Sequence, residues 1–107
     1  MKLQCPCGSI ISDSTDGLPC KAHLIPDQEW VPLSISLEKV VADAVSRRME
    51  LENAFMQIHL LLASRLVYQC RDCGRLFVDD NQHNSHIYTP SSDGTSKEIL
   101  RSRPENP

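Results

Sequence analysis

Two short cysteine motifs, far apart in the sequence, most constrain the fold of this chain. The first is Cys5-Pro6-Cys7-Gly8, and the second, Cys70-Arg71-Asp72-Cys73-Gly74, begins more than sixty residues later. Two cysteines separated by two residues offer one edge of a sulfur tetrahedron when the backbone turns tightly around a metal ion. A glycine directly after the pair accepts the unusual backbone dihedrals of such a turn. The two motifs therefore predict one metal site that ties two distant segments together.

The sequence leaves open whether all four metal ligands come from the two motifs. The gap in the first motif is one residue shorter than in the second, so the two turns must differ, and Cys20 and His23 offer a competing pair. We expect Cys5, Cys7, Cys70 and Cys73 to hold the metal. In the alternative, Cys20 or His23 replaces one of them. Zinc is the expected ion and iron the alternative. A zinc ion with four thiolate ligands has no open position, so we expect a structural site.

The cysteine count and the N-terminal sequence favour a reducing compartment. Five cysteines cannot all pair in disulfides. The first residues contain no apolar run typical of a signal peptide, and no segment approaches the roughly 20 apolar residues of a membrane span. We therefore expect a cytoplasmic protein that does not contact a membrane and keeps its thiols reduced.

A long helix is predicted between the two motifs, because residues 34–73 contain neither glycine nor proline and apolar residues recur every three or four positions. We place this helix at about 35–64. It would be about 45 Å long, more than a compact domain of this size can cover, so it must overhang, bend or break near residues 46–48. An overhanging apolar stripe needs a protein partner or a second copy to cover it. Its centre is formed by Leu51, Phe55 and Ile58, the expected interface residues.

Short apolar segments outside this helix predict strands. They lie at residues 9–11, 22–25, 66–68, 76–78 and 86–89, and residues 79–85 have the composition of a hairpin connection. The fold class we expect is α+β: two short antiparallel β pieces joined at a four-cysteine zinc site, with one long helix inserted between them. Residues 1–90 would form this single domain. Residues 91–107 are polar and are predicted to be a mobile tail.

The two motifs together resemble those of a known group of proteins. "CPCG" combined with "CRDCGRLF" is similar to the zinc-ribbon and rubredoxin-like small metal-binding folds, over about residues 3–11 and 67–78. The long helix is not part of a minimal ribbon. The resemblance implies a metal centre of four cysteines at the tips of two β-hairpins. Because many zinc ribbons bind nucleic acid, it also implies an alternative function in which Arg71 and Arg75 act with nearby aromatic rings, namely Tyr68, Phe77 and Tyr88.

Composition and motifs favour a binding protein. We find no Gly-x-Ser-x-Gly, phosphate-binding loop or His-Glu-x-x-His pattern, so we expect no enzymatic activity. A net charge of −3 gives no general attraction to nucleic acid. The sequence therefore predicts a zinc-binding protein-interaction module. Its class would be an adaptor, a regulator or an inhibitor such as the immunity protein of a bacterial toxin.

Overall fold

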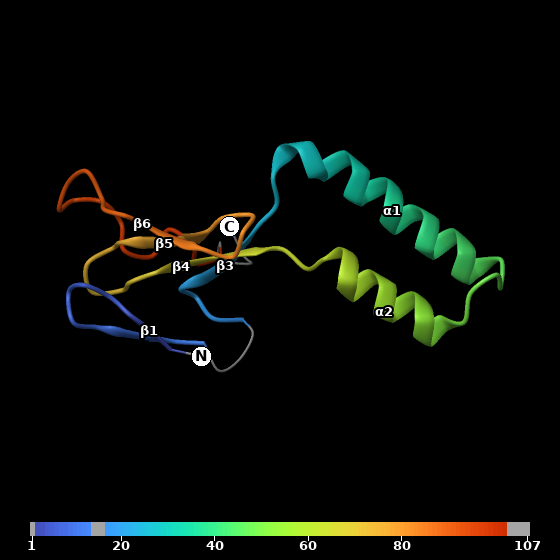
Figure 1. Ribbon diagram of the computed structural model, residues 1–107, viewed down its shortest axis with the longest axis horizontal. Coiled ribbons are helices and arrows are strands. Elements are labelled where there is room, and N and C mark those ends of the chain that lie inside the picture. The colour runs from blue at the N-terminus through green and yellow to red at the C-terminus, as the bar shows by residue number, and fades with distance from the viewer. Residues whose placement is uncertain (1, 14–16, 103–107) are drawn as a thin grey trace. The chain divides into compact units, whose positions relative to one another are not determined.

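The chain divides into two compact units in the computed structural model, which describes residues 2–13 and 17–102. The β unit combines Met1–Leu24 with Arg65–Pro107, and the helical unit is Ile25–Ser64. Figure 1 shows the strands and the two helices in their separate units. Both cysteine motifs belong to the β unit, so the candidate metal site can be described within it alone.

The β unit contains two antiparallel sheets. In the smaller sheet β1 pairs with β2, and Leu3 lies opposite Ile11. The larger sheet has the order β3-β4-β5-β6, with every neighbouring pair antiparallel. The strands are β1 (Lys2–Gln4), β2 (Ile10–Ser12), β3 (Lys21–Leu24), β4 (Arg65–Gln69), β5 (Leu76–Asp79) and β6 (Ser85–Tyr88). β2 to β6 confirm the strand predictions and the sheets confirm the α+β class, whereas β1 was not among the predicted segments.

The core of the β unit includes two of the motif cysteines. Its buried side chains are Cys5, Ile11, Tyr68, Cys70 and Phe77. Half-buried side chains pack around them: Leu3, Cys20, Leu66 and Cys73. The cysteines therefore fill space in the same core that holds the two sheets together.

The helical unit is a pair of helices, α1 (Asp27–Val45) and α2 (Leu51–Leu61), which run antiparallel side by side (Figure 1). The prediction of one continuous helix over residues 35–64 is wrong in this respect. The break falls where the expected helix length required a bend or a break. An antiparallel pair can bury one apolar edge of each helix against the other, which a single long helix cannot do.

Backbone geometry at Arg47 explains why α1 ends. Its φ of 61° is left-handed, and its N–H donates to the carbonyl of Ala44 at 3.2 Å. The N–H of Arg48 donates to the carbonyl of Asp43 at 2.9 Å. These two bonds form the Schellman motif, which usually requires glycine at the left-handed position. Because Arg47 occupies this position, the sequence lacks the glycine that usually marks the end of a helix.

The start of α1 also differs from the prediction. It begins at Asp27, directly after Pro26, and includes Pro32 as its sixth residue. Proline lacks the N–H that would bond the carbonyl four residues earlier, so its presence argued against a helix here. Asp27 and Glu29 in the first turn interact favourably with the helix dipole.

In the part of the chain that the structure describes, neither helix combines the length and the apolar character needed to cross a bilayer. Described residues 89–102 contain no helix or strand. The division into a domain of residues 1–90 and a mobile tail stays a prediction, and residues 103–107 of that tail lie outside the described residues.

Candidate metal centre

The first cysteine motif forms the turn between β1 and β2. The N–H of Cys5 donates to the carbonyl of Ser9 at 2.8 Å, and the N–H of Gly8 donates to the carbonyl of Cys5 at 2.9 Å. Gly8 has a φ of 99°, which an L-residue rarely adopts. Cys5 is buried, and Cys7 at the tip of the turn is exposed.

The second motif forms the connection between β4 and β5. The N–H of Gly74 donates to the carbonyl of Cys70 at 2.8 Å, and the N–H of Cys70 donates to the carbonyl of Arg75 at 2.9 Å. Gly74 has a φ of 82°. The expectation that both glycines accept unusual dihedrals is therefore confirmed.

The two turns bring four sulfur atoms together. The Sγ atoms of Cys5 and Cys73 are 3.4 Å apart, those of Cys7 and Cys70 are 3.6 Å apart, and all four lie within 4.8 Å of one another. Zinc–sulfur bonds of about 2.3 Å in a tetrahedron would place the sulfurs about 3.8 Å apart. All five cysteines are free thiols. The arrangement is consistent with a zinc-ribbon-like site, and the four sulfurs are close enough to hold one metal ion.

The environment of the four thiols is uneven. Burial raises the pKa of Cys5 to about 12, whereas hydrogen bonds from the backbone and hydroxyl of Ser9 lower the pKa of Cys7 to about 6. Arg75 donates from Nη1 to Cys73 Sγ at 3.3 Å, and this bond raises the pKa of the arginine. A cysteine binds a metal ion as the thiolate, so binding of a divalent cation would release the proton that burial keeps on Cys5.

The alternative ligands, Cys20 and His23, are not part of this group. Cys20 is half-buried against the core, and His23 lies in β3 opposite Leu66. The short gap in the first motif thus does not prevent Cys7 from joining the other three sulfurs.

One residue beside the site was missed by the sequence prediction. Gln69, which is fully buried, donates from Nε2 to the carbonyls of Gly74 at 3.3 Å and Ser96 at 3.1 Å. Its Oε1 accepts from the N–H of Ile99 at 2.9 Å. Its side chain thus connects the second cysteine turn to residues 96–101, which we call the C-terminal strap. No sequence signal marks a glutamine for such a role.

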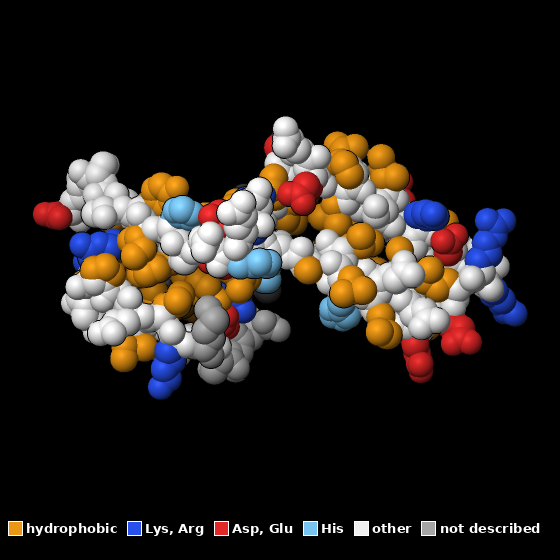
Figure 2. All heavy atoms as spheres, in the orientation of Figure 1, with side chains coloured by type: hydrophobic (Ala, Val, Ile, Leu, Met, Phe, Trp, Pro, Cys, Tyr) orange, Lys and Arg blue, Asp and Glu red, His pale blue; other side chains and the backbone are white. Residues whose placement is uncertain are grey.

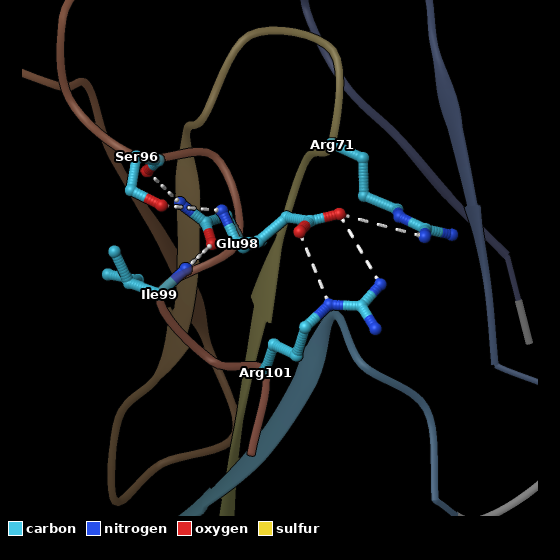
Figure 3. A network of polar contacts seen from close by, with 6 residues as sticks. Arg71, Ser96, Glu98, Ile99 and Arg101 are labelled. Carbon is cyan, nitrogen blue, oxygen red and sulfur yellow. Dashed lines mark hydrogen bonds and ion pairs between the residues drawn. The ribbon is translucent and has the colours of Figure 1, made fainter. Parts of the chain in front are cut away.

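Ion pairs also join the strap to the second cysteine turn. Glu98 lies between Arg71 and Arg101 (Figure 3). Its carboxylate is 3.9 Å from Arg71 Nη2 and 3.2 Å from Arg101 Nε. All three side chains are about half exposed, so these pairs contribute little to stability.

Two of the five residues of the nucleic-acid alternative are buried. Arg71 lies near Glu98, and Arg75 is directed to a sulfur. Of the three aromatic residues, Tyr68 and Phe77 are buried in the core and Tyr88 is exposed. One exposed ring is a poor platform for base stacking.

The expected interface residues all lie in α2. Leu51 and Phe55 are 62% and 55% exposed, and Ile58 is half-buried. Large apolar side chains at such exposure are available to a partner.

Comparison with known families gives one match. The family described as "Domain of unknown function (DUF8617)" matches residues 1–92. The chain belongs to this family. The DUF8617 match covers both cysteine motifs and both helices, and it ends before the C-terminal strap. No curated protein and no solved structure matches the chain.

Proposed function

We propose that this protein is a non-enzymatic protein-binding module whose β unit is held together by one structural zinc ion. Cys5, Cys7, Cys70 and Cys73 would be its ligands. The observation that carries the proposal is the group of four sulfur atoms within 4.8 Å of one another, contributed by two turns that are distant in sequence. Its class would be an adaptor, a regulator or an inhibitor.

A structural role for the ion follows from the ligand set and from burial. Four thiolates fill the tetrahedral coordination of zinc, so no position is left for a substrate or an activated water. Cys5 and Cys70 are also core residues of the β unit. Binding of the ion would therefore contribute directly to the free energy of folding. Zinc is favoured over iron as the ion that tetrahedral sulfur sites most commonly hold for structure.

The protein-binding part of the proposal rests on the helical unit. Its two helices bury Val40 and Ala54, whereas Trp30, Leu51 and Phe55 are more than half exposed. Exposed apolar clusters of this kind mark surfaces that bind other proteins.

Elemental analysis of the full-length protein, purified without added metal, tests the metal site. We expect close to one zinc per chain in the wild type and in Cys20→Ser. A Cys70→Ser, Cys73→Ser double variant should lose the zinc. Zinc retained by the double variant, or lost from Cys20→Ser, would contradict the ligand set.

Removal of the ion with a chelator tests its structural role. It should remove the tertiary signal in near-ultraviolet circular dichroism. An apo form that melts at the same temperature as the zinc-loaded protein would contradict this role.

A further inference from the structure

The helical unit has an inner seam and a separate apolar outer face. The seam is where α1 meets α2, and it includes Val40 and Ala54, which are 5% and 2% exposed. On α1, Trp30, Val41 and Val45 are exposed. Leu51 and Phe55 on α2 are exposed, as is Leu62, the residue that caps the end of α2. The exposed fractions of these six side chains range from 47% to 79%. We call these six residues the apolar face.

Helix geometry places all six on the same side of the pair. Each residue advances about 100° around a helix. Val41 follows the buried Val40, and Phe55 follows the buried Ala54, so both are turned in the same sense from the seam. When two helices run antiparallel, side chains that are rotated in the same direction away from the seam point to the same side of the pair. Figure 2 shows apolar side chains over both helices. The opposite side carries Ser36, Asp43, Asn53 and Gln57, and the exposed Ile35 and Leu60 lie at its edge, farther from the seam.

We infer that the apolar face binds a second copy of this chain, so that two helical units form a four-helix bundle. This inference rests on the proposed protein-binding function and names its partner. Two antiparallel helices with one apolar face are half of such a bundle, and an identical pair supplies the other half with the same spacing. In a dimer with twofold symmetry, the apolar face of each copy covers that of the other.

The area of the face supplies about three-quarters of what each partner of a standard interface buries. Six large apolar side chains at these exposures present roughly 600 Å², against about 800 Å² for each partner of a standard interface. None of the six side chains is charged, so the centre of the pairing buries no ion, and the exposed Glu38 and Glu52 lie at the edge of the face, about 60° beyond Val41 and Phe55. Residues 25–64 contain six acidic and three basic side chains, which disfavours nucleic acid or an anionic membrane as the occupant.

Sedimentation equilibrium of the full-length, zinc-loaded protein tests the inference, over micromolar to submillimolar concentrations. The chain mass is 12.0 kDa, and we expect a dimer of twice that mass. Phe55→Glu and Leu51→Glu should each give a monomer. Their circular dichroism and zinc content should stay at wild-type values, because both side chains are exposed in the free helical unit. Met56→Glu is the matched control: Met56 is 64% exposed on another side of α2, and this variant should remain a dimer.

A wild type that stays monomeric, or a folded Phe55→Glu protein that stays dimeric, would overturn the second copy as the partner. Binding of anilinonaphthalene sulfonate, a dye that binds exposed apolar surface, distinguishes failure of the dimer from failure of the proposed protein-binding function. A monomer that binds the dye, and loses that binding on Phe55→Glu, retains a face for a different protein. A monomer that does not bind the dye contradicts self-association and the protein-binding function together.

Discussion

Gln69 and Ile99, thirty residues apart, are joined by a hydrogen bond of 2.9 Å from the backbone N–H of Ile99 to the side-chain Oε1 of Gln69. The same amide group donates to Gly74 and Ser96. One buried side chain thus links the strand that leads into the second cysteine turn, the turn itself and the C-terminal strap.

Replacing Gln69 with Ala should detach the strap. The variant leaves one backbone N–H and two carbonyls without their partner, and we expect a loss of about 1–3 kcal/mol in the free energy of unfolding. The amide of Ile99 should exchange with solvent much faster. Arg101→Ala serves as a control, since it removes only an exposed ion pair and should cost less than about 1 kcal/mol. Unchanged protection of Ile99 in Gln69→Ala would contradict this role of the glutamine.

Replacing Gly74 with Ala should strain the second cysteine turn. Gly74 has a φ of 82°, and an added Cβ would lie 3.1 Å from Pro90 Cγ. We expect a destabilisation of about 1–3 kcal/mol in chemical denaturation. Gly94→Ala is the matched control, because a Cβ there meets nothing within 4 Å. Equal stability of the two variants would show that the turn relaxes without cost.

Asp80 should make the stability of the β5–β6 hairpin depend on pH. Hydrogen bonds from His86 and from the N–H groups of Asn84 and Gln82 lower the pKa of Asp80 from 3.8 to about 2. A lowered pKa means that folding favours the ionised form. This contribution is therefore complete above about pH 3.8 and is lost as the pH falls toward about 2.

Melting temperatures of wild type and Asp80→Asn, measured across this range, check the Asp80 prediction. The difference between the two proteins should be constant above pH 3.8 and shrink below it. Acid also protonates thiolates and releases metal. Because that loss is common to both proteins, it cancels in the difference, and zinc content is measured at each pH to confirm it. A difference that does not change with pH would show that Asp80 has its ordinary pKa.

Replacing Arg47 with Gly should stabilise the helical unit. Arg47 has a left-handed φ of 61°, a conformation that costs an L-residue about 1–2 kcal/mol and glycine almost nothing. After the entropy that glycine gains in the unfolded chain, a net gain of about 0.5–1 kcal/mol remains. Thermal melting followed by helical circular dichroism measures it. Arg48→Gly, where φ is not positive, should instead lower the melting temperature.

The candidate metal centre was readable from the sequence because its signals are local. A metal-binding turn needs cysteines at short spacing and a glycine at a left-handed position. Cys70 and Cys73 supply the first, and Gly74 supplies the second. The meeting of the two turns could be proposed from chemistry alone, since four thiols in one small chain favour a shared ion. The glycine after each cysteine pair favoured Cys7 over Cys20, and in the structure the turn between β1 and β2 places the Cys7 sulfur near the other three.

The two helices were read as one because the apolar spacing continues across the break. Steps of three and four residues run from Val41 through Ala44, Arg48 and Leu51 to Phe55, with only Arg48 polar, although the chain reverses at Arg47. Periodicity reports which positions are apolar and does not report where the backbone turns back. A left-handed arginine gives no compositional signal, and Pro32 inside α1 gives a misleading one.

The register of β3 and β4 has a consequence for how the metal centre assembles. Leu24 pairs with Arg65, so the 40 residues between them leave the sheet and return to it at adjacent positions. Cys7 and Cys70 are 63 residues apart along the chain. Once β3 and β4 have paired as far as Lys21 and Tyr68, the loop left to close is about 17 residues. The entropic cost of closing this loop is about 1 kcal/mol lower than the cost of closing the 63-residue loop. Early pairing of these two strands would therefore speed the meeting of the cysteine turns, and lengthening or shortening the helices would leave that step almost unaffected.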